Sequence, residues 1–364
     1  FGISYNRLND FNFNTSINGS TDTSSIITDF VNSANGFYPS QLSGTYEWLA
    51  YQTYLINPES SSDTSHYWGM MLPNTPLQQS KVIKSTGRMG ELAFSFAHSF
   101  NDKIYAGATL GVPLLKYRRE STYTEVDHTN SVWPFRTLKY EENLLTSGNG
   151  FNLKAGIIYR VSEKVRLGAY VHSPSVIKLT DNYEYKMSAN YDTAITTQGS
   201  AYSASYTGYF KYKAYTPARA GGSVSYIHNR LFALNADVEY IGYASARLKD
   251  NDNYLDPINL TIQKKYAATV NARAGIEFNI DPLILRAGYA GYGSFFGPFT
   301  GKFARNSFCG GIGFKRKKNT YFDIGAIYTR WTEDYYLYDP NLVKATSLTH
   351  SVVYLTFTLG IKFN

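Results

Sequence analysis

The chain has 364 residues, a formal net charge of +7, 33 tyrosines, 22 phenylalanines and 29 glycines. Charged residues make up 17% of it, below the roughly 25% of a typical soluble domain, and no apolar run reaches the roughly 18 residues of a transmembrane helix. Lys and Arg are scattered, which argues against a nucleic-acid-binding surface. Low charge with abundant Tyr and Gly favours a membrane β-barrel, whose lipid-facing residues alternate with others.

Alternation of apolar and polar residues predicts an all-β protein, a transmembrane antiparallel β-barrel that spans residues 1–364 as one domain. Its twelve expected strands cover 1–12, 83–100, 103–123, 135–160, 164–190, 204–227, 230–249, 264–280, 282–293, 304–316, 319–338 and 346–364. Tight connections such as Asn101-Asp102 and His228-Asn229 alternate with longer ones. This is the arrangement of a barrel in the bacterial outer membrane, with short turns periplasmic and long loops extracellular. A soluble β-protein, the alternative, has no reason to separate its loops in this way.

Residues 13–82 form the longest expected loop, and two of its segments have apolar residues at helical spacing. TDTSSIITDFVNSANG has capping residues before Ile26 and an Asn35-Gly36 stop, and QLSGTYEWLAYQTYLIN repeats the pattern. We expect two short amphipathic helices on the extracellular side. They would serve either as a lid packed on the barrel mouth or as a capture site for an apolar ligand. The candidate ligand-binding residues are Ile27, Phe30, Val31, Leu42, Trp48 and Leu49.

The phase of the alternation predicts which residues face lipid and which face the lumen. Phe357 and Thr358 fall on opposite faces of one strand, as do Leu234 and Asp237 of another. An unpaired charge facing lipid near mid-depth costs about 2–4 kcal/mol, so charged strand residues are expected in the lumen. These residues are Glu91, Lys154, Arg166, Arg219, Asp237, Glu239, Arg273, Glu277, Arg286, Asp323 and Lys362. Because both signs occur, we expect ion pairs that fill the lumen or contact a plug, rather than an ion-selective pore.

The sequence lacks the motifs of the enzymes and metal sites that this class of protein could carry. No His has a Ser two residues later, as in outer-membrane phospholipases, and neither G-x-S-x-G nor H-E-x-x-H occurs. DNDNYLD, residues 250–256, could supply calcium ligands, but Tyr254 occupies position five of the EF-hand register and no terminal Glu follows. We therefore expect a solvated loop there, no metal, no cofactor and no enzymatic activity.

Several segments resemble the FadL/OmpP1/TodX family of outer-membrane transport proteins, in the form found in Bacteroidota. They are FGISYNRLNDFN at 1–12, GELAFSFAHSFNDKIYAGATLGVPLLKYRRESTYTE at 90–125, HSPSVIKLTDNY at 172–183, TPARAGGSVSYI at 216–227 and ADVEYIGYASARL at 236–248. The resemblance implies uptake of hydrophobic molecules through a kinked strand and an opening in the barrel wall. Pro113, Pro174 and Pro217 are candidates for the kink, because proline cannot donate to a strand ladder.

The resemblance also implies a barrel of fourteen strands with an N-terminal hatch. Since this chain is expected to have twelve strands and no hatch, the hatch and two strands are expected to precede Phe1 in the full-length protein. A self-contained barrel of twelve strands would have to pair its first strand with its last.

The leading functional hypothesis is an outer-membrane channel for passive uptake of hydrophobic small molecules such as fatty acids. The alternative is a non-transporting barrel that serves as a subunit of a larger outer-membrane secretion or assembly complex. The expected partners are outer-membrane lipid and lipopolysaccharide, a hydrophobic small molecule and other outer-membrane proteins, with no nucleic acid.

Overall fold

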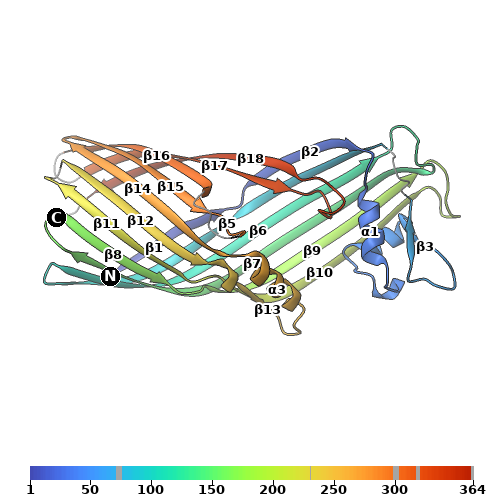
Figure 1. The fold of residues 1–364 in the computed structure, drawn as a ribbon, viewed down its shortest axis with the longest axis horizontal. Coiled ribbons are helices and arrows are strands. Elements are labelled where there is room, and N and C mark those ends of the chain that lie inside the picture. Colours follow the sequence, from blue (N-terminus) through green and yellow to red (C-terminus); the bar gives the residue numbers. More distant parts are fainter. Residues whose placement is uncertain (71–75, 230, 298–302, 317–319, 362–364) are drawn as a thin grey trace.

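The computed structural model describes the chain apart from residues 71–75, 230, 298–302, 317–319 and 362–364. Long strands form its wall (Figure 1). They are β1 (Gly2–Asp10), β2 (Phe13–Thr21), β5 (Leu77–Phe100), β6 (Ile104–Val126), β7 (Phe135–Arg160), β8 (Val165–His172), β9 (Val176–Tyr191), β10 (Ala201–Tyr215), β11 (Arg219–His228), β12 (Phe232–Gly242), β14 (Ala268–Ile280), β15 (Leu283–Gly293), β16 (Phe303–Arg316), β17 (Thr320–Tyr335) and β18 (Thr346–Ile361). The shorter elements are α1 (Ile26–Ala34), η1 (Pro39–Gln41), α2 (Glu47–Gln52), β3 (Ile56–Pro58), β4 (Tyr67–Gly69), η2 (Tyr243–Ser245), β13 (Arg247–Lys249) and α3 (Asp256–Lys265).

The wall is one antiparallel sheet with up-and-down connections. Its pairing order is β1-β5-β6-β7-β8-β11-β12-β14-β15-β16-β17-β18. β2 continues β1 along β5, and β9 continues β8 along β7. β10 pairs with β9, and the chain then continues as β11 beside β8. Such an order curls a sheet into the barrel-like wall of Figure 1.

The two outermost strands of this order, β1 and β18, share no ladder among the described residues. Side chains join this boundary instead. The rings of Phe13 and His350 lie 5.1 Å apart, and the Tyr338 hydroxyl accepts a hydrogen bond from Gln79 at 3.0 Å. A twelve-strand barrel closed by backbone pairing is therefore not what the described residues form. The fourteen-strand barrel with a hatch stays a prediction.

The two ends of the wall differ (Figure 1). One end, called the turn end here, carries tight turns, the first residue and the end of β18. The other, called the loop end, carries α1, α2 and β3 beside the long hairpins of β5–β7 and β9–β10. At the turn end Asn101 and Asp102 have φ values of 52° and 51°. Two-residue hairpin turns require this left-handed conformation, and Asn and Asp tolerate it.

The main hydrophobic core lies at the loop end, between the helices and the inner face of the long strands. Ile27, Phe30 and Leu49 are fully buried in one cluster with Tyr123 of β6. Ser25 caps α1, because its hydroxyl accepts the N–H of Ile27 at 3.0 Å. The helical segment is thus packed onto the wall as a lid.

The predicted loop 13–82 is longer than the loop in the structure. Phe13–Thr21 form β2, and β5 already begins at Leu77, so the connection covers residues 22–76. The alternation of apolar and polar residues does not predict β2, because Asn14, Ser16 and Asn18 make one of its faces polar where a membrane strand usually has apolar residues. The predicted loop 250–263 likewise contains most of α3.

Candidate functional site

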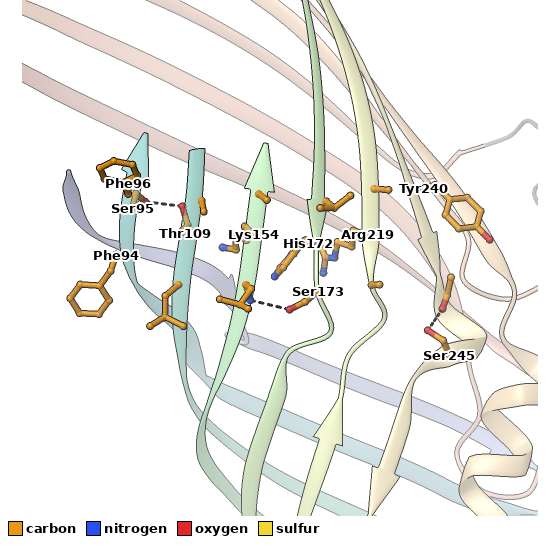
Figure 2. Close-up of a pocket in the computed structure, with 18 of the residues that line it drawn as sticks. Phe94, Ser95, Phe96, Thr109, Lys154, His172, Ser173, Arg219, Tyr240 and Ser245 are labelled. Carbon is orange, nitrogen blue, oxygen red and sulfur yellow. Dashed lines mark hydrogen bonds between the residues drawn. The ribbon is translucent and has the colours of Figure 1, made fainter. Parts of the chain in front are cut away.

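Two predicted strands are interrupted at neighbouring places in the wall. The expected strand 164–190 stops at His172 and resumes at Val176, across Ser173-Pro174-Ser175. The expected strand 204–227 stops at Tyr215 and resumes at Arg219, across Thr216-Pro217-Ala218. Figure 2 shows the strand bending at Ser173. Because proline has no N–H for a ladder, Pro174 and Pro217 account for both interruptions.

Side-chain hydroxyls replace the missing ladder bonds at these breaks. The Leu153 N–H donates to Ser173 Oγ at 2.9 Å, and the Ser173 N–H donates to the Leu153 carbonyl at 2.9 Å. On the other side of the same segment, the Ser175 N–H donates to Thr216 Oγ1 at 2.9 Å and the Thr216 N–H donates to the Ser175 carbonyl at 3.0 Å. The breaks are therefore specific, hydrogen-bonded bends of the wall.

A third break lies in the next strand. β12 ends at Gly242, and the chain turns through η2 into β13, which pairs with β10 instead of β11. Pro113, the remaining candidate for a kink, stays inside β6 and lies opposite Glu91 of β5, while the ladder between β6 and β7 skips Val112 and Pro113. Pro174 and Pro217 thus mark the interruption, whereas Pro113 does not end a strand.

An apolar groove of about 940 Å³ lies beside these breaks (Figure 2). It crosses six neighbouring strands, from Phe94 on β5 to Tyr240 on β12. Its large apolar side chains belong to the outward-facing set of the alternation, and they are exposed. They are Phe94, Phe96, Leu110, Leu153, Val171 and Tyr240. Small residues such as Ala155 and Ala220 lie between them and leave the hollow open.

A larger cavity of about 2710 Å³ occupies the lumen. The groove and this cavity share the lining residues Thr109, Lys154, Ala155, Val171, His172 and Arg219. Lys154 lies opposite His172, and His172 lies opposite Arg219, so these side chains form one row across β7, β8 and β11. Only this row of residues therefore separates the groove from the lumen, directly beside the breaks.

A buried polar cluster holds the wall together behind the breaks. Glu91 is fully buried and forms an ion pair with Lys154. Its other carboxylate oxygen accepts a hydrogen bond from Asn152 at 2.8 Å, and the same amide donates to Ser175 at 3.1 Å. The cluster therefore links β5 and β7 to Ser175, the residue directly before β9.

Most of the charged residues expected in the lumen line the cavity. They are Lys154, Arg219, Asp237, Glu239, Arg273, Glu277, Arg286 and Asp323. Arg273 pairs with Asp237 and Glu239 at 3.1 and 2.9 Å. Arg286 pairs with Glu277 and Asp323 at 2.7 and 2.6 Å.

The other expected lumen residues are placed differently. Glu91 is enclosed in the wall by its partners. Arg166 is exposed in β8 but does not line the cavity. Lys362 lies outside the described residues.

The residues expected to capture a ligand lie in the lid. Ile27, Phe30 and Leu49 have no exposed area, and Leu42 retains 9%. Val31 and Trp48 are partly buried and pack against the same core. Most of this apolar area is therefore used inside the protein, which is the arrangement of a packed lid.

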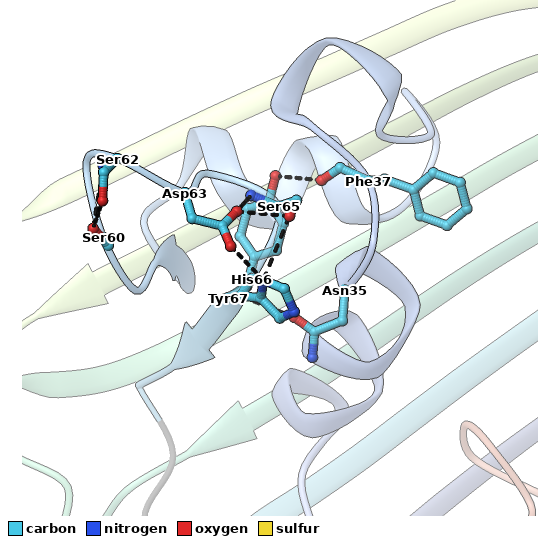
Figure 3. A network of polar contacts seen from close by, with 8 residues as sticks. All are labelled: Asn35, Phe37, Ser60, Ser62, Asp63, Ser65, His66 and Tyr67. Carbon is cyan, nitrogen blue, oxygen red and sulfur yellow. Dashed lines mark hydrogen bonds and ion pairs between the residues drawn. The ribbon is translucent and has the colours of Figure 1, made fainter.

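A polar network fixes the hairpin that follows the helices (Figure 3). The carboxylate of Asp63 accepts the N–H and hydroxyl of Ser65 at 3.0 and 2.7 Å and lies 2.9 Å from His66. These contacts, above all those from Ser65, lower the pKa of Asp63 to about 2. Tyr67 then ties the hairpin to the lid, since its N–H donates to Asn35 at 2.8 Å and its hydroxyl donates to the Phe37 carbonyl at 3.1 Å.

An aromatic cluster on the lining of the cavity has no counterpart among the predicted site residues. Phe295 and Phe296 lie 4.3 Å apart, and Tyr266 is within 5.4 Å of both rings. Tyr243 contacts Phe295 at 5.7 Å, and all four residues line the cavity. Two adjacent Phe residues in an expected loop were a sequence signal for this cluster, because a solvated loop has little use for them.

The 250–256 segment is a capped turn. Asp250 is buried, and its carboxylate accepts the N–H groups of Asp252, Tyr254 and Leu255. Across the described ranges, no three His, Cys, Asp or Glu residues gather in a way that could hold a metal ion. Of the helices in the described part of the chain, none has the length and apolarity to cross a membrane.

No protein-family model and no curated protein matches this chain. Solved structures match it in fold. A FadL homologue from Pseudomonas aeruginosa is 15% identical, with 79% of this chain and 75% of that one covered and a TM-score of 0.50. The toluene transporter TodX of P. putida is 12% identical (82% and 81% covered, TM-score 0.49). The toluene transporter TbuX of Ralstonia pickettii is 12% identical (82% and 85% covered, TM-score 0.38). The likeness to the FadL homologue shows that the two chains share a fold.

Proposed function

We propose that this protein is an outer-membrane channel of the FadL type that admits hydrophobic small molecules. The observation that carries the proposal is the row Lys154–His172–Arg219, which lines the lumen cavity on one side and the apolar groove on the other. A solute that passes this row beside the broken ladders moves from the lumen to the outer face of the wall. It then enters the lipid directly and does not pass through the periplasmic end of the barrel.

The lumen is suited to an uncharged or amphipathic solute more than to ions. The described lining of the cavity carries six Lys or Arg residues and seven Asp or Glu residues, so its positive and negative charges largely offset one another. The aromatic cluster of Tyr243, Tyr266, Phe295 and Phe296 offers apolar surface on the lining of the cavity. Burial of apolar solute area there releases roughly 25 cal/mol per Å². We propose that this cluster, rather than the packed lid, first receives the solute.

Fatty acids are the solutes we propose first. Arg219 places positive charge beside the groove, in the same row as Lys154, whose ammonium group pairs with Glu91. A carboxylate is attracted to the Arg219 guanidinium, while an alkyl chain fits along Phe94, Leu110 and Leu153. In this proposal the loop end is extracellular, the turn end is periplasmic, and the chain is related to the FadL/OmpP1/TodX proteins of Bacteroidota.

The free edges of β1 and β18 favour a second candidate function. An unpaired strand edge is a template for pairing with another chain, and lipid offers no hydrogen bonds to satisfy it. A barrel that completes its wall with a partner would be a subunit of a larger outer-membrane assembly. Co-purification of a stoichiometric partner paired to β18, together with no solute uptake, would support this candidate over the channel.

The test is uptake by cells that lack their own channels for hydrophobic solutes. Ala155 lines both the groove and the lumen, so Ala155→Trp should obstruct the path between them. The control is Ile312→Trp in β16, a position that is 56% exposed, lines neither the groove nor the lumen cavity and lies beyond β14 and β15 from the groove in the pairing order. We expect labelled oleate uptake to fall severalfold with Ala155→Trp and to be unchanged with Ile312→Trp. Equal uptake by both variants would reject the lateral path.

A further inference from the structure

Three lysines stand side by side on the outer face of the wall, near the broken strands. Lys178 of β9 lies opposite Lys213 of β10, and Lys213 lies opposite Lys249 of β13. Directly opposed residues of an antiparallel pair have Cβ atoms about 4.5–5.5 Å apart on the same face of the sheet. All three residues are exposed. They are called the lysine row below.

The described protein offers the lysine row no counter-charge. None of the ion pairs or side-chain hydrogen bonds among the described residues includes Lys178, Lys213 or Lys249. Like charges that face each other directly destabilise a sheet. Lys211 adds a fourth charge on the same face, two residues from Lys213, and its ammonium group lies 5.5 Å from the centroid of the Tyr209 ring. An anion bound along the row would relieve this repulsion.

The lysine row borders the apolar surface of the wall. Val176 lies two residues from Lys178 on the same face of β9. It is opposite Phe151 of β7 and Tyr215 of β10. Phe151 is 56% exposed, and Leu153 of the groove follows it on that face with 58% exposed. A strand rises about 3.4 Å per residue, so Lys178 and Lys213 stand within about 7 Å of Val176 and Tyr215 along their strands. A strip of positive charge thus runs along the edge of an exposed apolar band.

We propose that the lysine row binds the phosphate groups of a phosphorylated membrane lipid in the leaflet at the loop end, while its acyl chains lie along Phe151 and Leu153. This inference rests on the membrane placement in the proposed function. Only an amphiphile whose anionic headgroup adjoins its acyl chains satisfies the charged row and the apolar band together. An acidic protein would neutralise the lysines and leave the apolar band uncovered. Such a lipid therefore matches the surface in its charge and in the position of its headgroup next to its acyl chains.

The chain contains a control set of three lysines on the same outer face, of which Lys139 is paired with Glu141 at 2.6 Å. Lys186 stands eight positions beyond Lys178 in β9, and Lys84 and Lys139 are outward-facing residues of β5 and β7. All three are exposed and lie farther from the apolar band. Replacing them removes the same number of charges without touching the lysine row.

The experiment titrates detergent-solubilised protein with diphosphoryl lipid A and counts bound lipid by native mass spectrometry. The variant Lys178→Gln/Lys213→Gln/Lys249→Gln should bind at least about tenfold more weakly, as expected for three cations near lipid phosphates. The variant Lys84→Gln/Lys139→Gln/Lys186→Gln should bind like the wild type, and the dephosphorylated lipid should bind weakly to every form. Because all six positions are exposed, both variants should retain the heat-sensitive electrophoretic mobility of the folded wild type.

Three results would overturn the inference: equal affinity in the lysine-row variant, an equal loss in the control variant, or tighter binding of a polyglutamate peptide than of the lipid. Oleate uptake measured on the same variants separates this inference from the proposed function. Normal uptake without lysine-dependent lipid binding overturns only the lipid site. Lysine-dependent lipid binding without uptake in the wild type overturns only the channel.

Discussion

The ring of Phe13 lies 5.1 Å from the ring of His350, and this contact joins β2 to β18 where the described wall has no backbone ladder. His350 also stacks on Trp331 at 4.6 Å, and its Nε2 lies 2.9 Å from Glu333. One imidazole therefore links two edges that backbone hydrogen bonds leave separate.

Replacing His350 should loosen this boundary more than an ordinary surface change would. Aromatic pairs contribute about 0.5–1.5 kcal/mol beyond the area they bury, so we expect His350→Ala to lower the free energy of unfolding by about 1–2 kcal/mol. The measurement is urea unfolding in detergent, followed by tryptophan fluorescence. His98→Ala is the control, because His98 contacts Phe100 of its own strand. A loss of equal size in both variants would contradict a bridging role for His350.

The hydrogen bonds at the break predict the effect of Thr216→Val. Valine keeps the shape of threonine but removes the hydroxyl that accepts the Ser175 N–H at 2.9 Å. A buried donor left without a partner costs about 1–3 kcal/mol. We expect a loss of that size in the same unfolding assay. Thr207→Val, on the exposed outer face of β10, should change stability by less than about 0.5 kcal/mol.

The ion pairs of Arg286 predict a change in ion leakage. Its guanidinium binds Glu277 and Asp323 at 2.7 and 2.6 Å, so Arg286→Gln leaves two carboxylates without their cation. Negative charge lining a pore favours cations. We therefore expect a higher ratio of potassium to chloride permeability in planar bilayers. Arg166→Gln, outside the cavity lining, should leave the ratio unchanged, and an equal shift in both variants would argue against a lumenal Arg286.

The pKa of Asp63 predicts an acid response confined to the hairpin beyond the lid. Since this pKa is lowered to about 2 in the folded protein from an ordinary value of 3.8, the carboxylate contacts stabilise the hairpin above about pH 4. Their contribution is lost as the pH falls through about 2. Hydrogen exchange of the 60–67 segment should therefore accelerate between pH 4 and pH 2, after correction for intrinsic rates. Asp63→Asn should show the faster exchange already at pH 4, whereas Asp22→Asn should not.

The lid can be tested through Phe30, which is fully buried and packs against Tyr46 at 4.5 Å. Phe30→Ala removes a large core side chain, which typically costs 3–5 kcal/mol. Limited proteolysis should then cleave within residues 22–76 while the wall stays resistant. Trp68→Ala removes a side chain that is 44% exposed and should leave the lid resistant. Simultaneous digestion of wall and lid would show that the two do not unfold separately.

The sequence by itself determines the faces of the strands, because successive residues in a strand point to opposite sides. Asp237 and Arg273 are placed in the lumen by parity alone, and the cavity is lined by both. The tight turns and the helix at Ile26–Ala34 are likewise local, since turn residues and capping residues act within a few positions. β2 is not predicted, because the face that carries Asn14, Ser16 and Asn18 is polar, and Phe13 and Ile17 are the only large apolar residues of its other face.

Only the tertiary structure decides which of three prolines end a strand. Pro113 lies opposite Glu91 within a continuous β6 and interrupts only its ladder with β7, whereas Pro174 and Pro217 meet at the same height because β9 pairs with β10. The lysine row depends on pairing in the same way, since Lys178, Lys213 and Lys249 come from three strands. Alternation fixes the face of each residue but not its neighbour in the next strand. That neighbour is set by register, which arises from contacts between residues far apart in the chain.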